Sequence, residues 1–439
     1  MATADDTGRD DPPPSVLPGA PFLQRSAAGL TLDGLALDAL AREFGTPLYV
    51  YSQRAMLAAL AAYRQALAGR EHLVCYACKA NSNLAVLQTF ARAGCGFDIV
   101  SAGELARVRS AGAAASQIVF SGVGKTAAEM RIALQAGVRC FNVESVGELE
   151  RLSQVAVALG RTAPVSLRVN PDVDARTHPY ISTGLKDNKF GIAHAQALAA
   201  YRRAAALPGL RVEGIDCHIG SQITQVEPYL DAIDRLLDLV EAVEAAGVPI
   251  HHLDLGGGLG ITYRDETPPD AGTLVRRMLA RIDARGHGRR PLLLEPGRSL
   301  VGNAGVLLTE VQYLKPGADG DAKNFCIVDA AMNDLARPAM YGAWMAIEAC
   351  VPRAAPAQRW DIVGPVCESG DWIGRDRELA LQPGDMLAVL SAGAYGMAMS
   401  SNYNSRPRAA EVLIVDGVPR LVRARETVPE LFAGETLLP

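Results

Sequence analysis

One lysine occupies a position suited to amine chemistry. Lys79 ends an apolar run, LVCYACKAN (73–81), that is typical of a buried strand. A primary amine in a dry place has a lowered pKa and acts as a nucleophile, as a Schiff-base lysine must. Arginine cannot do this chemistry, and only six of the 43 basic residues are lysines (79, 125, 186, 189, 315 and 323). For a lone strand-end lysine, a solvated ammonium on a packed stem is the commoner outcome.

A glycine run and a carboxylate follow two later apolar runs. In LDLGGGLG (253–260), Gly256, Gly257 and Gly258 would let backbone N–H groups approach a phosphate, although a tight turn would use glycine as well. The run is no dinucleotide fingerprint, because Ile261 stands where a small residue is needed. In LLLEPGR, Glu295 either forms an ion pair with Arg298 or another arginine, or serves a pyridine nitrogen, keeping that ring protonated as an electron sink.

Further candidates are weak when taken singly. His218 in DCHIGSQ is either a satisfied strand-end histidine or a ring that stacks on a cofactor. Cys367, beside acids in CESGD, is either inert or a proton carrier, and Tyr395 lies in a glycine-flanked loop. Arg337 and Tyr341 could bind a carboxylate through a guanidinium fork and a hydroxyl.

Eight short apolar runs would position these groups. They span residues 73–79, 97–101, 118–122, 140–145, 165–170, 212–220, 252–258 and 292–297, and most are separated by segments with helical spacing. Alternating apolar strands and helices predict a parallel sheet covered on both faces, and eight units suit an α/β fold of the (β/α)8 type. Catalytic groups of such barrels gather at the carboxyl ends of the strands. Those ends hold Lys79, Asp98, Ser121, Glu144, Asn170, His218, Gly256–Gly258 and Glu295. A doubly wound open sheet is the alternative.

The pattern changes after the eighth run. From residue 304 to 439 the segments are β-rich with little helix, which predicts a C-terminal β-domain. Residues 22–44 are expected to join that domain, residues 45–303 to form the barrel, and residues 1–21 to be a disordered tail.

Composition excludes several classes of function. A net charge of −5 gives no basic surface for nucleic acid or anionic membrane. The acidic, proline-rich N-terminus does not resemble a signal peptide, and the uncharged stretch 386–405 is too polar to span a bilayer. Eight scattered cysteines fit reduced thiols, hence a cytoplasmic location. Cys75 and Cys78 would point to opposite faces of a strand, so no metal site is expected.

Taken together, the motifs resemble those of the diaminopimelate decarboxylases, a branch of the fold-type III pyridoxal-phosphate decarboxylases. The resemblance covers the chain from about residue 29 to its end. The segments that carry it occur in the family's order: YACKAN, FDIVSAGEL, HPYISTGLKDNKFGI, HIGSQ, LDLGGGLG, EPGRS, MNDLARPAMYGAW, CESGD and GAYGMAMSSNYNSRPR.

The resemblance implies that pyridoxal 5'-phosphate is the cofactor and meso-2,6-diaminopimelate the substrate, which loses CO2 to give L-lysine. It implies an internal aldimine on Lys79, ring stacking by His218, Glu295 at the pyridine nitrogen and Cys367 as the proton donor to Cα. Pro296, Gly297 and Tyr395 would join the glycine run and Arg298 around the cofactor. Arg298, Arg337, Tyr341, Glu368 and Tyr395 would bind the substrate, Glu368 taking its distal ammonium. The family's active site is completed across a homodimer, with CESGD coming from the other subunit.

Three rival functions are open. A related decarboxylase would act on arginine, ornithine or a carboxynorspermidine-like substrate, but Arg337, Tyr341 and CESGD favour a substrate with a distal carboxylate. A racemase would be expected to place arginine, rather than Glu295, at the pyridine nitrogen. A catalytically inactive regulator would be marked by loss of Lys79 or Cys367, and both are present.

Overall fold

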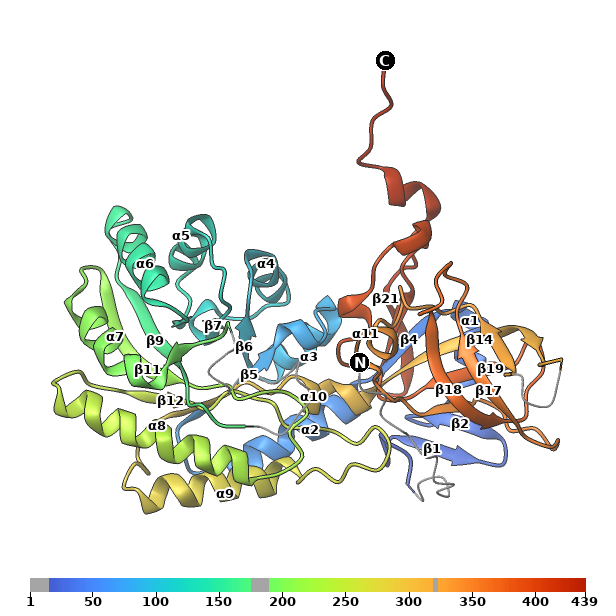
Figure 1. The fold of residues 1–439 in the computed structure, drawn as a ribbon, viewed down its shortest axis with the longest axis horizontal. Coiled ribbons are helices and arrows are strands. Elements are labelled where there is room, and N and C mark those ends of the chain that lie inside the picture. The colour runs from blue at the N-terminus through green and yellow to red at the C-terminus, as the bar shows by residue number, and fades with distance from the viewer. Residues whose placement is uncertain (1–15, 175–188, 319–322) are drawn as a thin grey trace.

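The computed structural model describes residues 16–174, 189–318 and 323–439. Within them lie a helix-covered barrel and a second, β-rich unit, side by side (Figure 1). Most of the expected tail and most of the HPYISTGLKDNKFGI segment, including Lys186, lie outside the described residues. No helix in the described ranges is both long and apolar enough to cross a membrane.

Eight parallel strands form the barrel, and it closes because β8 and β9 pair with each other as well as with their other neighbours. The strands are β5 (His72–Ala77), β6 (Gly96–Ile99), β7 (Ile118–Phe120), β8 (Cys140–Val143), β9 (Ala163–Asn170), β11 (Leu210–Asp216), β12 (His252–Asp254) and β13 (Leu292–Leu294). A short β10 (Ile192–Ala193) extends from the end of β9. The predicted (β/α)8 barrel is confirmed, and the open-sheet alternative is wrong.

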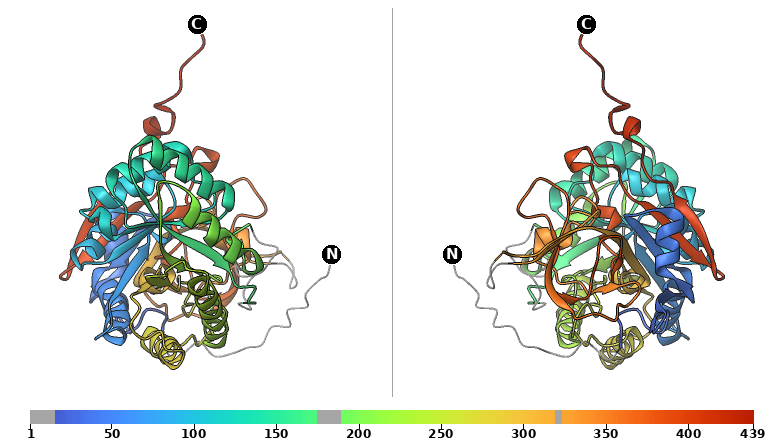
Figure 2. Two further views of the ribbon diagram at one scale, coloured as in Figure 1. Left: turned by 90° about the vertical axis from the view of Figure 1, so that its left-hand side faces the viewer. Right: turned by 90° about the vertical axis from the view of Figure 1, so that its right-hand side faces the viewer.

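Helices surround these strands, as the end-on view in the left panel of Figure 2 shows. They are α2 (Gln53–Ala66), α3 (Leu84–Arg92), α4 (Ala102–Ser110), α5 (Ala127–Ala136), α6 (Val146–Ala158), α7 (His194–Ala206), α8 (Glu227–Ala245), α9 (Ala271–Ala284) and the short α10 (Arg298–Val301). Local sequence sets their ends: α5 begins with a capping box between Thr126 and Glu129 and ends at Gly137, whose φ is 76°. In α8, Leu230, Ile233 and Leu237 are buried on one face, as their helical spacing predicts.

The second unit is built around the long strand β14 (Gly305–Lys315), which pairs with β15, β19 and β4. Its other elements are β15 (Phe325–Val328), α11 (Arg337–Tyr341), β16 (Ile347–Ala349), β17 (Gln358–Val363), β18 (Trp372–Leu379), β19 (Met386–Val389), β20 (Ala410–Val415) and β21 (Val418–Arg423). This unit lies beside the barrel, and Arg337, the first residue of α11, donates a hydrogen bond to Tyr263 of the barrel unit.

The N-terminal segment packs on this second unit. It comprises β1 (Leu23–Ser26), β2 (Gly29–Leu32), β3 (Leu35–Ala36) and α1 (Leu37–Phe44), whose apolar side chains share one core with those of β14, β19 and β20. The next strand, β4 (Leu48–Ser52), pairs with β14 and β20. The expected boundary at residue 45 would place β4 in the barrel unit, whereas it belongs to the second sheet. All five of its residues are buried, a pattern that suits either sheet, so the pattern alone could not assign the strand.

Candidate active site

Lys79 lies just beyond the end of β5, in a single turn of 3-10 helix (Cys78–Ala80). Its Nζ donates a hydrogen bond to Asp98 Oδ2 on β6 at 2.8 Å, and its side chain keeps 40% of its accessible surface. Asp98 is almost fully buried. The amine therefore reaches the rim of the barrel while an ion pair holds it in place.

The pKa of Lys79 shifts in the direction opposite to the expectation. Desolvation lowers the pKa of Lys79, but the negative charge of Asp98, with further contributions from Tyr395 and Glu295, raises it more, so it lies above the ordinary value for lysine. The prediction of a lowered pKa is therefore wrong for the protein without a bound cofactor, because the apolar strand leads to a carboxylate that the sequence pattern does not place beside the amine.

Glu295 follows β13 directly and is 6% exposed. Its Oε1 accepts a hydrogen bond from Asn142 Nδ2 at 3.1 Å. Burial and the charges of Asp254 and Asp98 raise the pKa of Glu295 well above its usual range. Among the described residues neither Arg298 nor another arginine forms an ion pair with Glu295, so the alternative of a simple ion pair is wrong.

The glycine run fills a narrow seam between the loops after β11, β12 and β13. A Cβ on Gly256, Gly257 or Gly258 would lie 2.5, 2.1 or 2.2 Å from the backbone oxygen of Cys217, Glu295 or Gly220, respectively. Two of the three N–H groups are already used: Gly256 donates to Asp254 Oδ1 at 3.0 Å, and Gly257 donates to His218 Nδ1 at 3.1 Å. The Gly258 N–H donates to no described residue and so is available to an anion.

His218 is positioned by this seam. Because its Nδ1 accepts the Gly257 N–H, that nitrogen carries no proton. Burial, together with the positive charges of Arg168 and Lys79, lowers the pKa of His218 well below its ordinary value. The imidazole is therefore neutral, which suits a ring that packs against a flat cofactor better than one that transfers protons near neutral pH.

Two arginines meet at one phenol. Arg298, the first residue of α10, and Arg337, the first residue of α11, each donate a hydrogen bond to Tyr263 Oη at 2.6 Å. Arg298 also donates to Ser221 Oγ at 2.9 Å and lies 4.8 Å from the centre of the Tyr395 ring. Tyr395 is tied to the Lys79 turn, since its N–H donates to the Ala80 carbonyl at 2.8 Å. The structure thus joins Arg298, Arg337 and Tyr395 into one group at the rim.

The remaining predicted residues are Pro296 and Gly297, Cys367 and Glu368, and Tyr341. The Pro296 carbonyl accepts from Ala77 N at 3.1 Å, and a Cβ on Gly297 would lie 3.1 Å from the Cβ atoms of Ala77 and Ala80, so both pack against the Lys79 strand end. Cys367 and Glu368 are exposed, and among the described residues they make no hydrogen bond or ion pair with Lys79, Glu295 or Arg298. Tyr341 ends α11.

Several residues of the site were not predicted from the sequence. Asp216 ends β11 and Asp254 ends β12, and each has an oxygen within 4.8 Å of Glu295. The signal that could have predicted both is an aspartate inside an apolar run, as in GIDCH and HLDLG. No such signal marks Arg168 or Tyr263, because only the fold brings them to the rim. Arg168 pairs there with Glu144 at 3.1 Å.

The residues at the rim fit pyridoxal phosphate. Its aldehyde requires a primary amine, which Lys79 offers. Its phosphate requires close-approaching N–H groups and a cation, and the glycine seam with Gly258 N–H and the buried guanidinium of Arg298 offers both. To stay protonated as an electron sink, its pyridine nitrogen requires a carboxyl partner, and Glu295 is one. A barrel with these three groups at the ends of β5, β12 and β13 defines a pyridoxal-phosphate enzyme of fold-type III.

Comparison with known proteins gives the same class and narrows it. A family model described as pyridoxal-dependent decarboxylase, pyridoxal binding domain, matches residues 53–302. Diaminopimelate decarboxylase of Pseudomonas aeruginosa is 61% identical over 94% of this chain and 98% of its own length. Among solved structures, diaminopimelate decarboxylase of M. jannaschii in complex with L-lysine has a TM-score of 0.90 at 38% identity, covering 96% of this chain and 99% of the other. The Helicobacter pylori enzyme with L-lysine has a TM-score of 0.86 at 39% identity, covering 91% and 98%.

The chain belongs to the diaminopimelate decarboxylase family, within the pyridoxal-dependent decarboxylases.

Proposed function

We propose that this protein is a carboxy-lyase that uses pyridoxal 5'-phosphate to convert meso-2,6-diaminopimelate to L-lysine and CO2. The observation that carries the proposal is the gathering of a primary amine, a glycine seam and a proton-holding carboxyl at the ends of β5, β12 and β13. Relatives named diaminopimelate decarboxylase and solved relatives with L-lysine bound support the substrate and the product.

The chain's own residues would hold the cofactor at four points. Lys79 would attach it covalently through Nζ, and Gly258 N–H with Arg298 would bind its phosphate. Neutral His218, fixed by the Gly257 N–H, would cover one face of the ring. Glu295 would sit at the pyridine nitrogen. Bound there, the cofactor supplies an electron sink for the pair of electrons that the departing carboxylate leaves behind.

Substrate selection would rest on charge at its distal end. The distal centre carries a carboxylate and an ammonium, for which Arg337 with Tyr341 and Glu368 are the complementary groups. Arg337 is 7% exposed and has its Nη1 on Tyr263 Oη, so its guanidinium is already oriented. A substrate without the distal carboxylate would leave this buried cation unpaired, which disfavours lysine and ornithine.

We propose further that a second copy of the chain completes the site. The turn that presents Cys367 and Glu368 is fixed by Asp371, whose carboxylate accepts from Met332 N and Val366 N at 2.7 Å each. In this turn Cys367 and Glu368 are exposed, and within the described residues neither forms a hydrogen bond or an ion pair with Lys79 of the same chain. A homodimer that brings the turn to the partner's rim would let Cys367 Sγ protonate Cα. A cytoplasmic location is also proposed, since all eight cysteines are free thiols.

The decisive experiment is CO2 release by the purified protein with meso-diaminopimelate, L-lysine, L-ornithine and L-arginine as substrates. We expect release from meso-diaminopimelate alone, together with a visible absorption band from the attached cofactor. Lys79→Ala should abolish both, whereas Lys315→Ala, which replaces an exposed lysine at the end of β14, should change neither. Retention of the band and the activity in Lys79→Ala would refute the assignment.

A further inference from the structure

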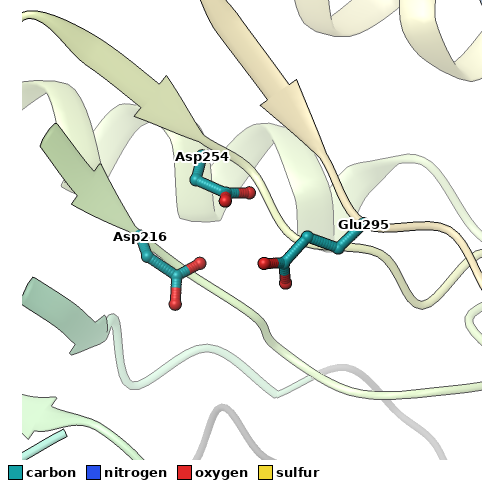
Figure 3. A group of neighbouring side chains, drawn as sticks. All are labelled: Asp216, Asp254 and Glu295. Carbon is teal, nitrogen blue, oxygen red and sulfur yellow. The ribbon is translucent and has the colours of Figure 1, made fainter. Parts of the chain in front are cut away.

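Three buried carboxyl groups converge below the rim of the barrel. Asp216 ends β11, Asp254 ends β12 and Glu295 follows β13, and an oxygen of each lies within 4.8 Å of the others. Figure 3 shows the three side chains pointing toward one another from neighbouring strands. Asp216 and Asp254 are at most 1% exposed. We call these three residues the carboxyl triad.

Among the described residues, no cation forms an ion pair with the triad. Lys79 is paired with Asp98, and Arg168 with Glu144. Over the described ranges, no lysine or arginine nitrogen lies within 4.0 Å of a triad oxygen. Asp216 Oδ1 and Asp254 Oδ2 are buried and have no hydrogen-bond partner in the part of the chain that the structure describes. With all three carboxyl groups ionised, the buried triad would hold three unpaired negative charges close together. This state is less stable than a partly protonated triad, so the triad must keep at least one proton at neutral pH.

The hydrogen bonds indicate which member is charged. Asp254 Oδ1 accepts the backbone N–H of Gly256 at 3.0 Å, a contact that stabilises a carboxylate, whereas Glu295 Oε1 accepts from the side-chain amide of Asn142. Burial raises the pKa of Asp254 to about 6, with the Gly256 N–H acting against it. Burial, and next the charge of Asp254, raises the pKa of Glu295 well above its ordinary value. At neutral pH Asp254 is thus the anion, and Glu295 is the acid beside it.

Other titratable groups also face the triad from the surrounding strands and loops. They are Lys79, Asp98, Glu144, Arg168 and the thiols of Cys75, Cys140 and Cys217. Burial raises the pKa of each of the three thiols, so they stay neutral and do not compete for the charge. The two cations, Lys79 and Arg168, are paired with Asp98 and Glu144. Among the neighbouring charges, that of Asp254 therefore raises the pKa of Glu295 most.

We propose that Asp254 is a positioning residue that keeps Glu295 protonated in the cofactor-free protein, so that Glu295 supplies the proton of the pyridine nitrogen. The proposal rests on the proposed function, in that it takes Glu295 to face the ring. The proton leaves the Glu295 carboxyl and joins the nitrogen lone pair, so that Glu295 becomes the carboxylate that pairs with the protonated ring. The total charge is unchanged, and no proton is taken from solvent.

The first test measures the protonated carboxyl directly, by infrared spectroscopy of the apoprotein as a function of pH. At pH 7.5 the wild type should show the band of a buried carboxylic acid that disappears in Glu295→Gln. In Asp254→Asn the same band should be lost at a pH at least about one unit lower, because the neighbouring negative charge is gone. Asp334→Asn makes the same chemical change at a buried aspartate of the second unit and should leave the band unaltered.

The second test counts protons when pyridoxal phosphate is added to apoprotein, by calorimetry in buffers of different ionisation enthalpy. Asp254→Asn should take up more protons than the wild type, by up to about one per subunit, since its Glu295 no longer brings one. Equal counts, or a Glu295 band that titrates identically in the two proteins, would overturn the proposal.

Two further outcomes are decisive. If Asp254→Asn does not fold, the wild type still tests the idea, because absence of the Glu295 acid band at pH 7.5 refutes it. A metal ion found in the purified protein by elemental analysis, whose removal by chelator makes the acid band appear, would show that the triad holds a cation instead. Both tests use apoprotein, so they can fail while meso-diaminopimelate is still decarboxylated, and failure of the proposed function would appear separately in the substrate assay.

Discussion

Gly257→Ala tests whether the glycine seam fixes the position of Glu295. Gly257 has no left-handed backbone angle, so alanine is strained there only by contact. Its Cβ would lie 2.1 Å from the Glu295 carbonyl oxygen and 2.8 Å from the carbonyl carbon, whereas real Cβ atoms stay beyond 3.0 Å. The obstacle is backbone rather than a flexible side-chain end, so the loop after β13 must move by roughly 1 Å. Overpacking of this kind costs about 1–3 kcal/mol.

The displacement has a functional consequence larger than its cost in stability. Glu295 N donates to the Gly256 carbonyl at 2.6 Å, so the two loops are joined at the point where the added methyl group would push them apart. Movement of Glu295 by an ångström would take its carboxyl out of line with the pyridine nitrogen that it is proposed to face, and misplacement on that scale can cost about 100-fold in rate. We therefore expect weaker cofactor binding and a large loss of turnover from one methyl group.

The assay pairs denaturant unfolding of the apoprotein with a cofactor titration followed by visible absorbance. Gly147→Ala is the matched control, because Gly147 lies in the first turn of α6, has no atom within 4 Å of its added Cβ, and should gain up to about 1 kcal/mol. The reasoning is refuted if Gly257→Ala keeps the wild-type stability and cofactor affinity, or if Gly147→Ala loses as much.

Two other predictions address the shared site and the triad. If, as proposed, a homodimer shares the site between its subunits, Lys79→Ala and Cys367→Ala should each be nearly inactive, and an equal mixture refolded together should recover about a quarter of the wild-type activity. Half of the dimers would then be mixed, and each mixed dimer would have one intact site. A mixture as inactive as its components would contradict the shared site. The free energy of unfolding of the apoprotein should fall as pH rises from about 4 toward 6, because a carboxyl group whose pKa is raised in the folded state binds more protons there than in the unfolded state. The fall should be at most about 1.4 kcal/mol per pH unit for each proton. Asp254→Asn should make this fall shallower, and an unchanged slope would contradict the raised pKa of Asp254.

Strand periodicity and the barrel rule predicted the parts of the site that lie on the rim. Lys79, His218, Glu295 and the glycine run stand at strand ends in the structure, because each apolar run stops where the chain leaves the barrel wall. The same reasoning could not assign β4, whose five buried residues satisfy either sheet. The partner strands β14 and β20 decide its place, and they lie far along the chain.

What the sequence could not predict is the pairing of charges inside the barrel. Asp98, Asp216 and Asp254 each occupy one position in an apolar run, and a run alone does not say which polar side chain faces which. Closure of the barrel turns them toward Lys79 and Glu295. For this reason the amine, expected to have a lowered pKa, has a raised one, and the Gly256 and Gly257 N–H groups, expected to bind phosphate, are bound to Asp254 and His218.

These pairings give the barrel interior an excess of acid over base that a bound cofactor would relieve. Two cations serve two carboxylates, Lys79 with Asp98 and Arg168 with Glu144, and the triad remains without either. A ring nitrogen that becomes positive beside Glu295 would provide the missing cation, in a buried place where the electrostatic interaction is strong. The acidic excess that disfavours the empty site therefore favours the protonated ring, and the protonated ring is the form that withdraws electrons most strongly. The same three carboxyl groups that lower the stability of the apoprotein would in this way strengthen the electron sink.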